Sequence, residues 1–223
     1  MIGFDISASL AQSDTSALDA ILQQILRQAL KHQGDVLNAY FINATTKAQS
    51  PLTPSIVLPA APPAPQDERL EKRYRQKVER TAEKYRLKAC RNLRTAMTQT
   101  PALAPYTNLY ATLFWVAGAS QPLTDLFLFT DLKQDDGKID LSKGFANVNQ
   151  AEQTARKHAQ AFRQESGLSP RLLQNVRITF ILPPVRNLYQ SAPEASYLEA
   201  YWRTFLHDFG CPPQNIHFQP LTH

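Results

Sequence analysis

Short apolar runs that alternate with helical segments constrain the fold of this chain more than any other feature. The apolar runs cover residues 2–6, 36–42, 126–129, 176–182 and 215–221, and helical spacing marks residues 16–30, 66–97, 107–119, 149–166 and 194–209. Alternating strands and helices are typical of an open, mostly parallel sheet. With a further edge strand at 55–58, we expect an α/β fold with a doubly wound, six-stranded sheet and helices on both of its faces.

The composition fits one domain with a full core, because 43% of the 223 residues are hydrophobic. No run of about 18 apolar residues predicts a membrane span, and the N-terminus does not have the pattern of a signal peptide. Cys90 and Cys211 lack metal-type spacing, which favours two free thiols in a reducing compartment and leaves one disulfide open. We therefore expect a cytoplasmic protein. The short first strand is also consistent with a fragment whose upstream sequence is missing.

Six prolines between residues 51 and 65 interrupt the alternation. Proline lacks the N–H that a central strand needs, so this stretch predicts a stiff, extended connection with at most the short edge strand at 55–58. A ligand for a polyproline-binding protein is the alternative interpretation.

Residues 66–97 contain no glycine or proline, and their apolar positions recur in steps of three or four. This pattern predicts one amphipathic helix of about 45 Å. Between Asp67 and Arg94, eleven Lys and Arg residues stand against five Asp and Glu residues, so the positive excess of the chain lies here.

The excess of Lys and Arg on this helix has two interpretations. One is a solvated face with internal ion pairs, such as Glu79 with the nearby Lys84. The other is a docking surface for an acidic protein, a membrane surface or a nucleic acid, formed by Arg73, Lys77, Arg80 and Lys84. The basic face has no interleaved Phe or Trp, which counts against stacking on single strands. An acidic protein is therefore the expected partner, and nucleic acid is the less favoured alternative.

Polar side chains gather where apolar strands end. Asp5-Ile6-Ser7-Ala8-Ser9 ends the first run, and Asp131 follows the run at 126–129. Ligands of open α/β sheets bind beyond the carboxyl ends of the strands, and Thr107 follows a proline-broken loop that can reach the same edge. Carboxylate and hydroxyl oxygens suit a hard cation such as Mg²⁺. The alternatives are that Ser7 and Ser9 are turn residues, Thr107 a helix N-cap and Asp131 a loop residue.

At these residues the chain resembles the von Willebrand factor type A (VWA) domains, which carry a metal-ion-dependent adhesion site (MIDAS) with the pattern Asp-x-Ser-x-Ser, then Thr, then Asp. Residues 5–9 match the first part in full. Residues 105–111, Pro-Tyr-Thr-Asn-Leu-Tyr-Ala, are similar to the Gly-Gly-Thr-x-Leu-x-x-Ala segment without its two glycines. Residues 126–131 are similar to the hydrophobic-Thr-Asp-Gly segment, with Leu132 in place of glycine.

The resemblance covers nearly the whole chain and implies a single Rossmann-like VWA domain over 1–223, with 45–98 as an elaboration within it. It implies Mg²⁺, or alternatively Mn²⁺ or Ca²⁺, held by the hydroxyls of Ser7, Ser9 and Thr107. Asp5 and Asp131 would act through bound waters and balance the charge. It also implies that a partner protein supplies an Asp or Glu to an open position on the metal, without catalysis.

An enzyme is the rival class. A phosphohydrolase could use the strand-end Asp5 as its nucleophile with Mg²⁺, but such chemistry usually has a second carboxylate two residues later, where Ser7 stands. A nucleotide-binding site is not favoured, because the seven glycines form no phosphate loop. Binding of nucleic acid or another acidic surface through residues 66–97 is a further alternative.

Overall fold

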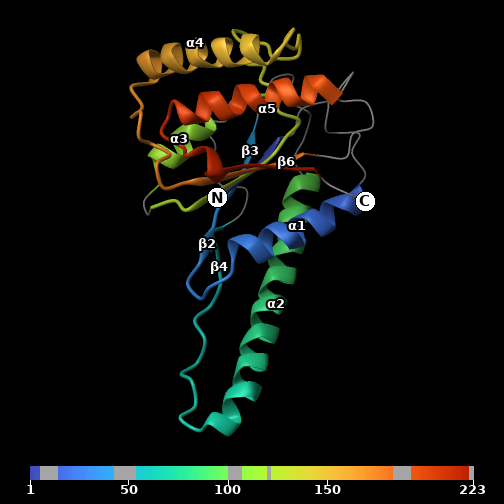
Figure 1. Ribbon diagram of the computed structural model, residues 1–223. Coiled ribbons are helices and arrows are strands. Elements are labelled where there is room, and N and C mark those ends of the chain that lie inside the picture. The colour runs from blue at the N-terminus through green and yellow to red at the C-terminus, as the bar shows by residue number, and fades with distance from the viewer. Residues whose placement is uncertain (6–14, 43–53, 100–106, 120–121, 183–191, 221–223) are drawn as a thin grey trace. The chain divides into compact units, whose positions relative to one another are not determined.

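A computed structural model describes residues 1–5, 15–42, 54–99, 107–119, 122–182 and 192–220 (Figure 1). The elements in chain order are β1 (Ile2–Asp5), α1 (Thr15–Ala29), β2 (Val36–Leu37), β3 (Ala39–Ile42), β4 (Ile56–Val57), α2 (Glu68–Gln99), α3 (Thr112–Ala117), β5 (Asp125–Phe129), α4 (Val148–Ser166), β6 (Arg177–Leu182), α5 (Ala192–His207), a 3₁₀ turn (Pro213–Asn215) and β7 (Ile216–Pro220). The chain forms two compact units: residues 1–13, 40–50 and 102–223, and residues 14–39 and 51–101. One domain over 1–223 stays a prediction.

A five-stranded sheet in the order β3-β1-β5-β6-β7 organises the first unit. β1 pairs in parallel with β5, β5 with β6, and β6 with β7. This confirms the predicted α/β class and the mostly parallel sheet. The side chains of β6 are buried on both sides of the strand from Ile178 to Leu182, as expected for a strand inside a parallel sheet.

The described residues place five strands in this sheet and not the predicted six. The run at 36–42 divides at Asn38 into β2 and β3, and Ser55 Oγ donates a 2.6 Å hydrogen bond to Asn38 Oδ1. β2 pairs antiparallel with β4 in a separate two-stranded ladder. The predicted edge strand therefore exists as β4, but it does not extend the main sheet.

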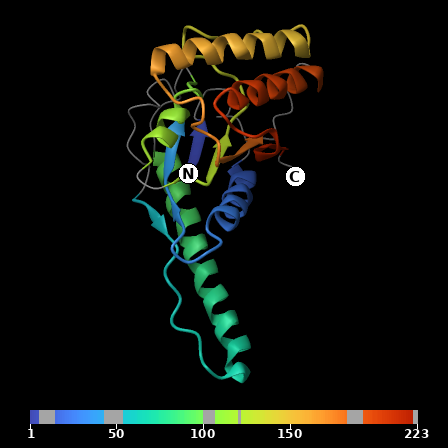
Figure 2. The same cartoon turned by 60° about the vertical axis from the view of Figure 1, so that its left-hand side comes forward.

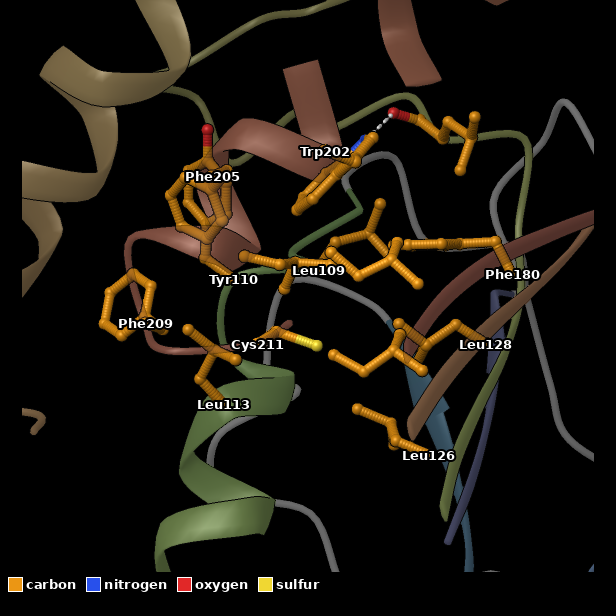
Figure 3. Packing of buried hydrophobic residues seen from close by; sticks show 14 of the residues in the cluster. Leu109, Tyr110, Leu113, Leu126, Leu128, Phe180, Trp202, Phe205, Phe209 and Cys211 are labelled. Carbon is orange, nitrogen blue, oxygen red and sulfur yellow. Dashed lines mark hydrogen bonds between the residues drawn. The ribbon is translucent and has the colours of Figure 1, made fainter. Parts of the chain in front are cut away.

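The core of the first unit gathers the side chains of one sheet face together with α3, α4 and α5. Figure 3 shows Phe180 of β6 next to Trp202 of α5, with Leu128 and Leu126 of β5 below them and Phe205 of α5 across the same cluster. Three alanines of α4 at intervals of four are fully buried, and Figures 1 and 2 both show α4 alongside α5. Small side chains let two helices approach closely. Helices on both faces stay a prediction.

Gly3 of β1 explains how Trp115 of α3 reaches the sheet. A Cβ at Gly3 would lie 2.9 Å from both Ile42 and Trp115, closer than real side-chain atoms approach. The Trp115 ring stacks on Tyr40 of β3 with 4.7 Å between the ring centroids. The absent side chain therefore makes room for an aromatic pair on the strand.

In the second unit, α1 packs against α2. Arg86 of α2 is buried and donates from Nε and Nη2 to the carbonyl of Leu30, at 3.1 and 2.8 Å. The last carbonyls of a helix have no partner within it, so Arg86 caps the end of α1. The single helix predicted at 66–97 is confirmed as α2. No helix in the described ranges is long and apolar enough to cross a bilayer.

Candidate metal centre

The carboxylate of Asp5 lies at the end of β1 and binds two threonine hydroxyls. Thr130 Oγ1 donates to Asp5 Oδ2 at 2.9 Å, and Thr107 Oγ1 donates to Asp5 Oδ1 at 3.2 Å. The pairing of Phe4 with Phe129 explains the first contact, because the next residues along the parallel strands are Asp5 and Thr130. All three side chains are buried, with at most 4% exposed. Three segments distant in sequence therefore meet at one carboxylate.

Thr107 is positioned by backbone pairing and not by a helix. Its N–H donates to the Asp135 carbonyl at 2.8 Å, and the Asp135 N–H donates to the Thr107 carbonyl at 2.9 Å. The predicted helix at 107–119 was wrong at its start, since α3 begins only at Thr112. The Asn108 side chain accepts a hydrogen bond from the Ala111 N–H at 3.0 Å. Such local bonds compete with helix formation.

The loop after β5 is held by hydrogen bonds on several sides. The Leu132 N–H donates to Thr130 Oγ1 at 3.2 Å, and the Lys133 N–H donates to Asp131 Oδ1 at 3.0 Å. Trp202 Nε1 of α5 donates to the Leu132 carbonyl at 2.9 Å, the dashed line in Figure 3. Asp131 is 1% exposed. A buried carboxylate is thus fixed directly after the threonine that binds Asp5.

Leu132 adopts the backbone conformation for which glycine is usual. Its φ is +67°, which makes it the sole non-glycine with positive φ among the described residues. This left-handed region costs an ordinary residue about 1–3 kcal/mol. The Leu132 side chain is fully buried in the core, so its packing offsets the strain. The departure from the glycine of the VWA pattern therefore does not prevent the turn.

Thr130 and Gln134 are site residues that the sequence interpretation missed. Gln134 is fully buried, and its Oε1 accepts a 2.6 Å hydrogen bond from the Leu109 N–H. It thereby links the segment after Thr107 to the loop after Asp131. Thr130 could have been found, because it precedes Asp131 at the strand end. Gln134 lies in a polar stretch and gives no such signal.

Three of the five predicted ligands lie in the described residues, namely Asp5, Thr107 and Asp131. The structure joins Asp5 to Thr107 and places Asp131 beside Thr130, while Ser7 and Ser9 lie outside the described residues. In the described residues no group of three His, Cys, Asp or Glu side chains could hold a metal ion. The predicted set has two carboxylates and three hydroxyls. The three members that are described, Asp5, Thr107 and Asp131, are buried oxygen donors, the class of ligand that a hard cation prefers.

The predicted docking residues Arg73, Lys77, Arg80 and Lys84 are all exposed on α2. The predicted pair of Glu79 with Lys84 was wrong in its partner, because Glu79 Oε1 lies 2.8 Å from Arg86 Nη1. Arg86 lies on the buried face of the helix, and from this position its guanidinium contacts Glu79.

A cavity of about 350 Å³ lies in the second unit, between residues 31–33, residues 58–62 and one turn of α2. Lys31, His32 and Lys77 are among its lining residues. It contains none of the predicted metal ligands.

A polar cluster lies inside the core of the first unit. The hydroxyls of Tyr110 and Tyr201 share a hydrogen bond, and His158 Nδ1 lies 2.7 Å from the Tyr201 hydroxyl. Burial raises the pKa of both tyrosines and lowers the pKa of His158, although the nearby Asp136 opposes the shift of the histidine. These groups are therefore neutral around pH 7, and their hydrogen bonds join α4 and α5.

No protein-family model, no curated protein and no solved structure matches this chain.

Proposed function

We propose that the chain is a metal-dependent protein-interaction module with a VWA-type fold. Mg²⁺, or Mn²⁺ or Ca²⁺ in its place, binds beyond β1 and β5 through Asp5, Ser7, Ser9, Thr107 and Asp131. One observation supports this most: the buried carboxylate of Asp5 receives the hydroxyls of Thr107 and Thr130 at the end of two parallel strands.

The chemistry of these donors favours a cation. The proposed ligands are carboxylate and hydroxyl oxygens, which are the donor atoms that a hard cation such as Mg²⁺ prefers. Bound metal supplies positive charge that a carboxylate from a partner can approach. Because hydroxyl ligands do not cancel the charge of the metal, an Asp or Glu of the partner gains a charge-assisted contact.

Binding without catalysis is part of this proposal. Both carboxylate oxygens of Asp5 accept hydroxyl hydrogens, which lowers their reactivity toward phosphorus. A cytoplasmic location is also part of it, because the buried Cys90 and Cys211 are free thiols, as a reducing compartment favours. Hydrolysis of a generic phosphate ester that the Asp5→Asn variant loses would replace this proposal with a phosphohydrolase.

Titration calorimetry with Mg²⁺ and with Mn²⁺ tests the metal site. The wild type should bind, and Asp5→Asn should lose binding at least tenfold while retaining its circular dichroism. Asp140→Asn is the matched control, because Asp140 lies in the same unit but binds the nearby Ser142. At a metal concentration of 100 Kd, the wild type should also gain about 2.7 kcal/mol in unfolding free energy. Equal heats for the wild type and Asp5→Asn would contradict the proposal.

A further inference from the structure

We propose that α2 binds the phosphate backbone of a nucleic-acid duplex, independently of sequence and of the metal centre. Seven cationic side chains follow one another along this helix at intervals of four, four, three, four, four and three residues. They are Arg69, Arg73, Lys77, Arg80, Lys84, Lys88 and Arg91, here called the basic stripe. Each one is exposed.

The spacing makes the basic stripe straight. At about 100° per residue, its members lie within an arc of about 100° and extend over about 33 Å of helix. The buried positions Ala82, Arg86, Ala89 and Leu93 lie on the opposite side of α2. Packing of α1 on that side therefore leaves the basic stripe uncovered within the second unit.

Three acidic residues of α2 whose side chains the structure describes, Glu71, Glu79 and Glu83, lie off the basic stripe and pair elsewhere. Glu71 pairs with Arg75, and Glu79 and Glu83 both pair with Arg86. Glu83 also binds Arg27 of α1, which together with Arg86 lowers the pKa of its carboxyl. Within the described residues, no ion pair joins a member of the basic stripe to an acid.

A row of like charges lowers the stability of a helix whose charged face contacts only water. Like charges three or four residues apart destabilise a helix by about 0.2–0.5 kcal/mol per pair, and the basic stripe contains a succession of them. Solvated helices usually interleave both signs, as the exposed pair of Glu71 with Arg75 does elsewhere on α2. A polyanion removes this repulsion, which indicates a ligand with a regular array of negative charge.

Composition favours phosphate over an acidic protein. Protein interfaces are depleted of lysine, and their binding energy comes from a central cluster of buried aromatic and Arg anchors. The basic stripe contains Arg, but the exposed apolar side chains near it form no such cluster: Leu70 and Leu87 are about 25 Å apart along the helix, and Tyr85 lies about 60° outside the stripe. Phosphate contacts need only Lys and Arg, and displaced counterions supply the free energy. The basic stripe has no aromatic residue for stacking on unpaired bases, so a duplex fits better than a single strand.

Fluorescence anisotropy with a labelled 24-base-pair DNA duplex, in EDTA, tests this proposal. Seven phosphate contacts predict a slope of about −6 in log affinity against log salt, or a loss of nearly four orders of magnitude, about 10^3.7-fold, between 50 and 200 mM KCl. The triple variant Lys77→Gln, Arg80→Gln, Lys84→Gln should flatten the slope by about three. The triple variant Arg27→Gln, Lys72→Gln, Arg75→Gln has the same net charge and should retain the wild-type slope.

Three outcomes would overturn the proposal. They are no binding at 50 mM KCl, equal losses in the two triple variants, and equally tight binding of polyglutamate. Circular dichroism of both variants excludes unfolding as the cause of a loss. Asp5→Asn should bind the duplex as the wild type does, so failure of this proposal and failure of the metal site are distinguishable.

Discussion

The end of the sheet around Asp5 and the basic stripe of α2 use charge in opposite ways. At Asp5, a few buried oxygens each have a specific partner, and Thr107 and Thr130 are fixed by further contacts. On the basic stripe, exposed cations repeat along one face without partners of opposite charge in the described residues. A buried polar group is expensive to change, because its partner loses a hydrogen bond that water cannot replace. Changing an exposed charge costs little folding stability, so substitutions on the basic stripe should affect ligand binding and leave the fold intact.

The largest expected effect concerns the strained turn beside Asp131. Leu132→Ala removes a fully buried side chain and should lower the free energy of unfolding by about 2–5 kcal/mol. Leu132→Gly loses one carbon more but relieves the positive φ, so it should be about 1 kcal/mol more stable than Leu132→Ala. Urea denaturation of both variants measures this difference. If glycine were the less stable of the two, the strain at this position would be refuted.

A smaller loss of folding stability is expected at Arg86. This residue belongs to α2, but its side chain is buried and has specific partners, as Asp5 has. Arg86→Met removes the cap on the Leu30 carbonyl and should cost about 2–3 kcal/mol. Arg75→Met is the matched control, because its pair with Glu71 is exposed and should cost at most about 0.5 kcal/mol. Thermal denaturation of the two variants measures both values. Equal costs would remove the distinction between buried and exposed charge within this helix.

The smallest effect is a pH dependence from His158. Burial lowers its pKa below the ordinary value of 6.5, so the unfolded chain binds a proton more readily than the folded chain. The neutral histidine therefore contributes its full share of the folding stability above about pH 6.5. This share is lost as the pH falls from there through the lowered pKa of the folded state. His158→Gln should reduce this acid sensitivity. Urea melts between pH 5 and 7.5 check this, and an unchanged profile in His158→Gln would contradict it.

The parts of the fold that sequence could predict are those set by local pattern. Alternating apolar runs predicted β1, β5, β6 and β7 to within one or two residues, and the absence of glycine and proline predicted α2. Strand ends also identified Asp5 and Asp131, because parallel strands finish at the same edge. These inferences need only neighbouring residues and the geometry of a sheet.

The remaining features depend on contacts that no local pattern shows. The break at Asn38 involves Ser55, and the late start of α3 reflects the pairing of Thr107 with Asp135. The role of Gln134 requires the Leu109 N–H to lie beside it in space. The partner of Glu79 was mispredicted for a related reason, since Glu79 pairs with Arg86, whose burial no local pattern showed, and not with Lys84.

The contacts of Asp5 also have a consequence for folding kinetics. Its hydrogen bonds reach Thr107 and Thr130 across 102 and 125 residues of chain. Contacts of such long range form late, because closing large loops costs entropy before the contact is gained. A ligand that binds at Asp5 would therefore find its site only after β1 and β5 have paired. Such a ligand should slow unfolding and leave the rate of the early folding steps unchanged.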